Sequence, residues 1–548
     1  MDTKTRKQNI SSALFCIAVF VCMFVFFFCC HPIVVLDADD WQYLSYVRPA
    51  VPYTGFWNPS RILPEILMPF CGTVALAVFR IFPVGYIEAQ TAVFGFTLAA
   101  FITAYVYAFV RLMETKFRLS RQTAFLFGAL FLSLHFLIFR TEASGNLYMF
   151  SSYDACCYFY YTIPALLNCT LVMFFSYTST LNTFFTPENL LKKGLLVAIL
   201  YLAIFSNLFN SIILVAYLGC DFLMDLVYII RRKEKFASLL KADLFQLIII
   251  FVWLIAVFLE SRGGRGFGYW PRKEYFNNIR ATAALSAEIF KSFNLLFVAI
   301  GVLSVAAAAV TYLAERKKSR LAPSEEADIS DADISDSEGR EFSGFANSNT
   351  PADLSGAYLF EFFDLHLSSA CVIFLFLVLL CARVEKNYFT RPQVMFGYIF
   401  SLFVIIMSCI AYVIKKHRQL IVFLPLTLLI VLSIINTQNI TFAPSNTLGL
   451  SEQACISADN DLIAQMTAAD SDGTERLALQ VMNTGINDNW PHTPHVAYGL
   501  KQTLLKHGII LRNFEIVPEM SKDFNERNGI HVEFFWPDEY RSFYPTLY

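Results

Sequence analysis

Residues 12–41 read SALFCIAVFVCMFVFFFCCHPIVVLDADDW, an apolar run that ends in three aspartates and a tryptophan. No charged residue occurs from position 12 to position 36, which is longer than the roughly 20 residues a helix needs to cross a bilayer. The residues before the run include three basic ones, Lys4, Arg6 and Lys7. The run is followed by a group that we call the acidic cluster, Asp37, Asp39 and Asp40. Because basic residues mark the cytoplasmic side, we expect an uncleaved first transmembrane helix with the acidic cluster on the outer face.

The composition extends this reading to the whole chain. The sequence has 548 residues, of which 56% are hydrophobic and 56 are phenylalanine, and its formal net charge is −2. Such a composition predicts a polytopic α-helical membrane protein. The 13 cysteines lie mostly within apolar runs, where they act as small hydrophobic residues rather than a disulfide framework. No Walker A loop and no GxSxG motif is present, so the sequence gives no sign of nucleotide hydrolysis or of a serine hydrolase.

Apolar runs of the right length predict about eleven membrane spans. Their ranges are 12–34, 86–111, 122–140, 155–178, 194–209, 211–230, 242–260, 287–314, 367–384, 394–414 and 419–437. With this set, the basic groups at 116–121, 192–193, 231–235, 316–320 and 415–418 all fall on the cytoplasmic side. Residues 62–82 are also apolar, but if they crossed the membrane, the basic residues at 116–121 would lie outside, against the positive-inside rule. We therefore expect them to form a helix that lies on the outer membrane surface or re-enters it.

Two segments differ from the rest. Residues 321–358 are rich in Asp, Glu and Ser, and we expect a disordered cytoplasmic loop. The transmembrane part, 1–437, is followed by 438–548, where polar and apolar segments alternate as in a small extracytoplasmic α/β domain. Its expected strands are Leu477–Met482 and His531–Phe535, and its expected helices are Asp459–Thr467 and Ala497–Lys506, the last ended by Gly508.

The first outer loop, Asp37 to Arg61, is the strongest candidate for a site. Carboxylates can accept the proton of a hydroxyl group, arginines neutralise phosphate, and aromatic faces pack against sugar rings. The residues of this loop that we expect to contact a substrate are Asp37, Trp41, Tyr43, Trp57 and Arg61. The alternative is that the acidic cluster only caps a helix at the membrane edge. The nearby Arg61 and the many aromatic residues favour a site over a cap.

Other outer loops supply further candidates. Asp154 precedes the span at 155–178, where a helix cap and a functional role are equally good readings. Arg262 and Arg265 lie in a glycine-rich outer loop against the positive-inside trend, which an anionic ligand would explain. A flexible basic loop that touches lipid head groups explains them nearly as well. Arg391, in the next outer loop, is another phosphate-binding candidate.

The sequence LDADDW at 36–41, followed by WNPSR at 57–61 and an apolar surface segment, resembles the GT-C superfamily of membrane glycosyltransferases. The bacterial type that uses polyprenyl-phosphate sugars is the most similar. This resemblance implies inverting sugar transfer on the outer face, with Asp39 or Asp40 as general base. It also implies that Arg61, Arg265 or Arg391 binds the donor phosphate, and that Asp40 with Asp154 holds a divalent cation, Mg or Mn, if one is used.

The sequence thus predicts a plasma-membrane glycosyltransferase with a cytoplasmic N-terminus and an extracytoplasmic C-terminal domain. Its expected partners are a polyprenyl-phosphate-linked sugar donor, an acceptor that is an envelope glycan or lipid, and membrane lipids, but no nucleic acid. A transporter or flippase, or a polysaccharide polymerase, is the alternative. Transporters usually carry paired repeats and charges near the midplane of the membrane, whereas here the charges gather in outer loops.

Overall fold

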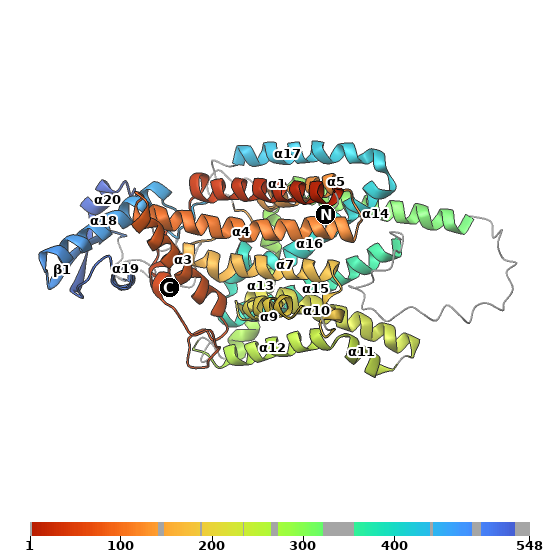
Figure 1. Cartoon of the computed structure of the whole chain (residues 1–548), viewed down its shortest axis with the longest axis horizontal. Coiled ribbons are helices and arrows are strands. Elements are labelled where there is room, and N and C mark those ends of the chain that lie inside the picture. Colours follow the sequence, from red (N-terminus) through yellow and green to blue (C-terminus); the bar gives the residue numbers. More distant parts are fainter. Residues whose placement is uncertain are drawn as a thin grey trace.

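The protein is a long bundle of helices with a small mixed region at one end (Figure 1). The computed structural model describes residues 3–140, 147–186, 189–233, 235–264, 272–321, 356–438, 442–484 and 495–531. The helices of the first half are α1 (Thr3–Val25), α2 (Ala38–Ser45), α3 (Ile62–Ile81), α4 (Tyr86–Thr115), α5 (Arg121–Leu137), α6 (Ala155–Cys157), α7 (Ile163–Tyr177), α8 (Thr180–Thr183), α9 (Leu190–Ile204), α10 (Leu208–Arg232), α11 (Phe236–Ala242) and α12 (Leu244–Ser261). Wider π-helical turns at Phe26–Cys30 and Tyr158–Thr162 extend α1 and join α6 to α7.

The second half adds five helices to the bundle and five elements beyond it. The bundle helices are α13 (Arg272–Ser292), α14 (Leu295–Leu321), α15 (Gly356–Val384), α16 (Pro392–Lys416) and α17 (Phe423–Gln438), with 3-10 turns at Lys386–Thr390 and Arg418–Val422. The elements beyond it are α18 (Glu452–Asp472), β1 (Arg476–Met482), α19 (His495–Lys506), β2 (Glu515–Ser521) and α20 (Lys522–Arg527).

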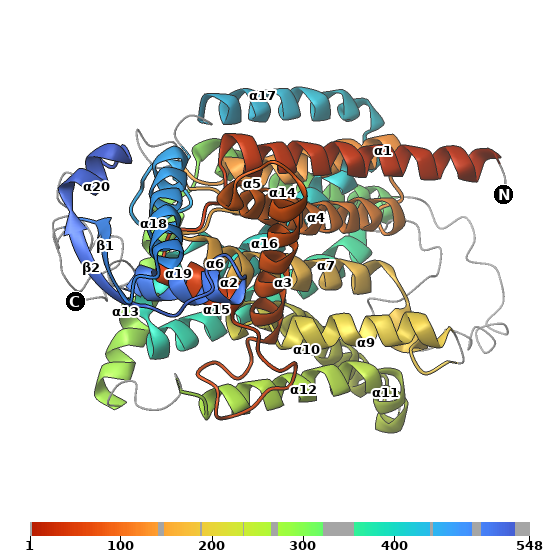
Figure 2. The same ribbon diagram turned by 60° about the vertical axis from the view of Figure 1, so that its left-hand side comes forward.

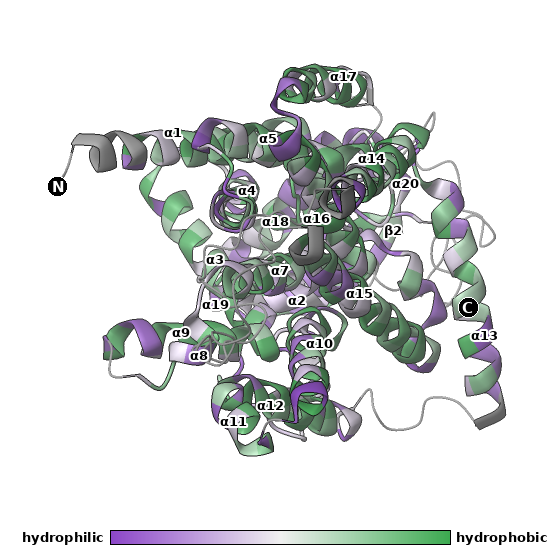
Figure 3. Ribbon diagram, turned by 90° about the vertical axis from the view of Figure 1, so that its right-hand side faces the viewer, coloured by the Kyte–Doolittle hydropathy of each residue, from purple (hydrophilic) through white to green (hydrophobic). Residues whose placement is uncertain are grey.

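The polytopic helical fold is confirmed. Among the described residues, 10 helices are long and apolar enough to cross a membrane. All but one of them coincide with a predicted span, and the exception is α3. Figure 3 draws α17 mostly in the green of hydrophobic residues, and only 11% of its span is buried inside the protein, as only 17% of the α1 span is, which suits contact with lipid.

Two predicted spans are shorter in the structure. The helix expected at 122–140 is α5, which has 17 residues, and the one expected at 194–209 is α9, which has 15. A third span, predicted as a continuous helix over 287–314, is interrupted after Ser292. There Phe293 forms an isolated antiparallel bridge with Phe139, and the Asn294 side chain then caps α14 by accepting the Leu296 N–H at 2.9 Å. The bridge is a long-range pairing that the apolar pattern does not reveal.

Helix α3 runs crosswise to α1, α7 and α12 (Figure 2). It packs between α2 and α4 at the end of the bundle that carries the C-terminal elements. Its length and composition would suit a membrane span. Its direction instead favours a helix on the membrane surface, which remains a prediction.

The C-terminal elements combine helices with a parallel pair of strands, β1 and β2, in register from Arg476 with Glu515 to Met482 with Ser521. The predicted strand Leu477–Met482 lies in β1, and the predicted helices lie in α18 and α19. Gly508 adopts a φ of +63°, which suits its expected role after a helix end. The second strand is β2, whereas the one predicted at His531–Phe535 lies outside the described residues except for His531. Of the predicted disordered loop, Leu321 and 356–358 are helical, and the rest lies outside the described residues.

Candidate functional site

The acidic cluster lies on the first turn of α2. Asp37 is the N-cap residue, and it forms a reciprocal capping box with Asp40 three positions later. Such a box satisfies backbone N–H groups that the first turn of a helix leaves without partners. The alternative reading of the sequence, that Asp37 and Asp40 cap a helix, therefore describes part of what these two residues do.

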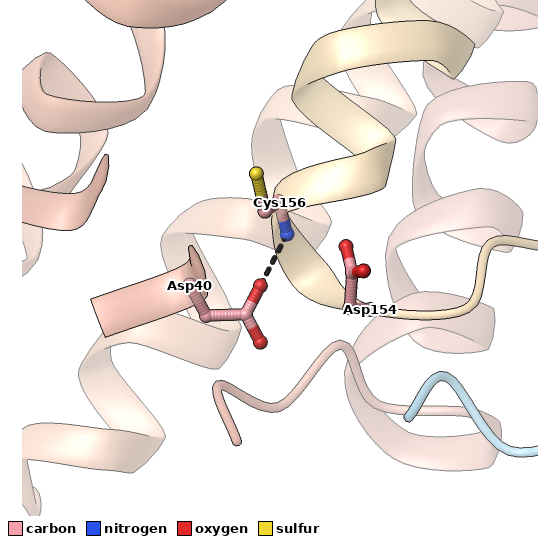
Figure 4. A group of neighbouring side chains, drawn as sticks. All are labelled: Asp40, Asp154 and Cys156. Carbon is pink, nitrogen blue, oxygen red and sulfur yellow. Dashed lines mark hydrogen bonds between the residues drawn. The ribbon is translucent and has the colours of Figure 1, made fainter. Parts of the chain in front are cut away.

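The Asp40 carboxylate is fully buried and accepts three backbone hydrogen bonds. Its Oδ2 atom accepts from the N–H groups of Leu36 and Asp37, both at 3.1 Å. Its Oδ1 atom accepts from the N–H of Cys156 at 2.6 Å, which links α2 to α6 (Figure 4). Burial and then the Asp154 charge raise the pKa of Asp40 well above that of an exposed aspartate, against the opposing effect of the three N–H donors.

Asp154 lies beside Asp40, at the N-cap of α6 (Figure 4). Its carboxylate accepts the N–H of Cys157 and, at 3.3 Å, the thiol of the same residue. Burial is the main cause that raises the pKa of Asp154, while the Cys157 hydrogen bonds and the Arg391 charge lower it. Asp154 therefore caps a helix and also lies beside Asp40.

Asp40, Asp154 and Cys156 hold potential metal-ligating atoms within 4.8 Å of one another. Mg²⁺ and Mn²⁺ require several oxygen ligands, usually including water. Here one of three donors is a thiol, and the carboxylate oxygens already accept N–H or S–H groups. The donor set therefore fits these hard cations poorly, and we derive no reaction step through a metal ion.

The other two carboxylates of the acidic cluster differ in exposure. Asp37 is buried and accepts a hydrogen bond from the Thr447 hydroxyl at 2.7 Å. Burial, followed by the charges of Asp40 and Asp154, raises the pKa of Asp37. Asp39 is only partly buried, and it lies within electrostatic range of Tyr43. Asp39 is thus the member of the cluster that a ligand can reach most easily.

Arg61 is a buried cation with an unusual environment. The residue is 7% exposed, and its guanidinium lies 5.1 Å from the ring centre of Tyr160 and 5.9 Å from that of Tyr161. Within the described residues its guanidinium donates no hydrogen bond and forms no ion pair. Burial lowers the pKa of Arg61, but Tyr161, Glu260 and other neighbours raise it by more, so the group stays charged.

The loop between α2 and α3, residues 46–61, is held by two acidic residues. Glu65 pairs with the buried Arg48 at 3.0 Å, and the same guanidinium donates to the carbonyl of Asn58 at 2.8 Å. Glu260, at the end of α12, accepts the N–H and the hydroxyl of Ser60 at 2.9 and 2.7 Å. These contacts fix the chain just before Arg61.

The remaining sequence candidates lie in different surroundings. Trp41 is fully buried, and its carbonyl accepts the hydroxyl of Thr503 on α19, so it joins α2 to the C-terminal elements. Trp57 is exposed, and Arg262 is exposed over the ring of Phe258. The Arg391 guanidinium lies 4.0 Å from the ring centre of Tyr388 and within electrostatic range of Asp154. Arg265 lies outside the described residues.

One buried acid was not anticipated from the sequence. Asp459 on α18 is fully buried, and neither carboxylate oxygen has a hydrogen-bond partner of good geometry among the described residues. It lines, with Leu36, a cavity of about 20 Å³, which has room for about one water molecule. Burial and then the Asp40 charge raise the pKa of Asp459, and the nearby Trp41 lowers it. In the sequence, Asp459 reads as an ordinary polar position of a helix.

Comparisons with protein-family models, with curated proteins and with solved structures found no match. The function is therefore inferred from the residues and their geometry.

Proposed function

We propose that the protein is a membrane glycosyltransferase that transfers a sugar from a polyprenyl-phosphate donor to an envelope glycan or lipid. In this proposal the end of the bundle that carries α2 and α3 faces outward in the plasma membrane, and the N-terminus is cytoplasmic. The C-terminal elements form an extracytoplasmic α/β domain over the site, and the fold is of the GT-C type.

The observation that carries the proposal is the state of Arg61. A buried guanidinium that forms no ion pair and donates no hydrogen bond among the described residues is costly even with the Glu260 and Glu65 charges nearby, and proteins usually pair such a charge directly. A phosphate group would supply two or more acceptor oxygens in the geometry that the guanidinium fork prefers. Tyr160 and Tyr161 add aromatic faces beside it. This combination suits a sugar phosphate better than a neutral ligand.

The acid and the cation lie in the same neighbourhood. Tyr43 is within electrostatic range of both Asp39 and Arg61. A base and a phosphate-binding cation at one location are what an attack on a glycosyl phosphate needs. This proximity supports group transfer over simple anion binding.

Among the aspartates, we assign the general base to Asp39. Asp40 accepts three backbone N–H groups, Asp37 accepts the Thr447 hydroxyl, and Asp154 caps α6. Asp37 and Asp40 are buried, so an acceptor hydroxyl cannot easily reach them, whereas Asp39 is only partly buried. Of the two candidates for the base that the sequence leaves open, Asp40 is thus better suited to positioning and Asp39 to catalysis.

The proposed step balances as a displacement. Asp39 takes the proton of an acceptor hydroxyl while that oxygen forms a bond to the anomeric carbon. The bond from this carbon to the phosphate oxygen breaks, and the electron pair leaves with polyprenyl phosphate. Arg61 neutralises the negative charge that develops on this leaving group. Attack from the face opposite the phosphate inverts the anomeric configuration.

The test uses the full chain in liposomes with a panel of polyprenyl-phosphate sugars and measures transfer to added acceptor glycans or lipids. We expect wild-type protein to transfer one of the sugars and Asp39→Asn to lose roughly 10²–10⁴-fold in rate, which is typical of a lost general base. The control is Asp523→Asn, at an exposed position on α20, which should leave the rate unchanged. Full activity of Asp39→Asn would refute the base, and movement of the donor lipid across the bilayer without transfer would favour a flippase.

A further inference from the structure

The exposed part of the loop between α2 and α3 carries no charge. Its exposed residues are Val47, Pro49, Ala50, Val51, Tyr53, Thr54, Gly55 and Trp57. Val47, Val51, Tyr53 and Trp57 are all more than half exposed. A loop in contact with water is normally rich in polar and charged side chains, so this composition calls for a different surrounding.

The loop has two charged residues, and both turn inward. Arg48 pairs with Glu65 and is buried, and Arg61 is buried against Tyr160. The charges are thus removed from the surface, while the apolar and aromatic side chains remain on it. This arrangement is the reverse of what a water-exposed loop requires.

The loop also lies against the end of a lipid-facing helix. Glu260, at the end of α12, holds Ser60, and a Cβ atom at Gly264 would lie 2.2 Å from the Trp57 ring, so the ring packs directly on this backbone. Figure 2 shows the loop running beside α12. The α12 residues Phe251, Leu254 and Phe258 are exposed, as expected for contact with lipid. The apolar surface of α12 therefore continues onto the loop.

We propose that residues 46–57 form an interfacial anchor that lies in the lipid bilayer at the boundary between head groups and acyl chains. Trp and Tyr prefer this depth because one end of each side chain is apolar and the other can form hydrogen bonds. Val47 and Val51 enter the acyl region beside them. The occupant of this surface is lipid, as the continuity with α12 indicates.

The anchor fixes the depth of the neighbouring Arg61. Only Asn58, Pro59 and Ser60 separate the anchor from Arg61, so the Arg61 guanidinium lies close to the plane of the phosphate head groups. This consequence holds whatever reaction the site performs.

The experiment measures the fluorescence of Trp57 in liposomes made with phospholipids brominated at different depths. The chain has six tryptophans, so the Trp57 signal is the difference between wild-type protein and Trp57→Phe. We expect this difference signal to be blue-shifted, quenched most by lipids brominated near the head group, and protected from iodide in water. The comparison variant is Trp253→Phe, since Trp253 is mostly buried and donates to Ser211. Its difference signal should be less sensitive to both quenchers.

A second variant separates insertion from folding. Val51→Glu adds a charge at an exposed position, so it should leave the thermal midpoint in detergent unchanged while it increases iodide quenching of Trp57 and reduces bromolipid quenching. Strong iodide quenching of Trp57 in the wild-type protein, without bromolipid quenching, would overturn the proposal. Protection from both quenchers would overturn it as well, because it would indicate a protein partner or a second copy on this surface.

Discussion

Arg48 and Arg61 are two buried arginines of one loop, and the structure predicts effects of different size when each is replaced by methionine. Arg48 is bound to Glu65 and to two backbone carbonyls. Arg48→Met leaves the Glu65 carboxylate buried, with the Tyr160 hydroxyl at 3.2 Å as its remaining hydrogen-bond partner among the described residues. Removing one partner of a buried ion pair costs about 3–5 kcal/mol.

Arg61→Met removes a buried charge that forms no ion pair or hydrogen bond within the described residues, although the Glu260 and Glu65 carboxylates lie within electrostatic range. The substitution loses two contacts with aromatic rings, each worth about 0.5–2 kcal/mol, together with the attraction of these two carboxylates. It also removes the desolvation cost of a buried ion, which is still several kcal/mol in real proteins. These two contributions oppose each other, so we expect Arg61→Met to lower the free energy of unfolding much less than Arg48→Met does.

The assay is thermal unfolding of the full chain in detergent, with and without inorganic phosphate. We expect Arg48→Met to lower the midpoint by several degrees and Arg61→Met to lower it much less. Phosphate should raise the midpoint of the wild-type protein but not that of Arg61→Met, with sodium chloride at equal ionic strength as the control. If Arg61→Met lowers the midpoint as much as Arg48→Met does, Arg61 is a structural cation and does not bind phosphate.

Three further predictions follow from the contacts around α2 and α19. Burial and then the charges of Arg80 and Lys506 lower the pKa of His507 to about 4. Between about pH 6.5 and 4 the unfolded chain therefore binds more protons at this histidine than the folded chain does, and the free energy of unfolding falls as the pH falls. The thermal midpoint of His507→Asn should depend less on pH in this window. A Cβ atom at Gly499 would lie 3.1 Å from the Trp41 Cβ, so Gly499→Val should cost roughly 1–3 kcal/mol and make α19 more sensitive to limited proteolysis, whereas protease resistance equal to wild type would contradict this packing. Because the donor set of Asp40, Asp154 and Cys156 suits Mg²⁺ poorly, sugar transfer should continue in EDTA, and a loss of activity that Mg²⁺ restores would count against this reading.

The apolar pattern predicts the bundle well because each span is a local property of about 20 residues. It does not reveal the break at Phe293, since that break depends on pairing with Phe139, far away in the sequence. The spacing of Asp37 and Asp40 does contain the signal of a capping box, and so the helix-cap alternative could be weighed from the sequence.

The candidate site can be predicted only in part from the sequence. Carboxylates and an arginine in one loop can be seen in the sequence, but burial and pairing cannot, so the difference between Arg48 and Arg61 emerges only when Glu65 is placed. The sequence does not indicate that Asp459 is buried, because a single aspartate in a helical pattern is usually exposed to solvent. Trp41 was expected at a binding surface, whereas the fold uses it as a core residue that contacts α19.

The hydrogen bonds of α2 also have a consequence for how the chain is made. Asp40 receives the N–H of Cys156, Asp37 receives the hydroxyl of Thr447, and the Trp41 carbonyl receives that of Thr503. These donors leave the ribosome long after α2 does. During synthesis the aspartates of α2 therefore make only their local capping contacts at the membrane edge, and the site is completed only when nearly the whole chain has been translated.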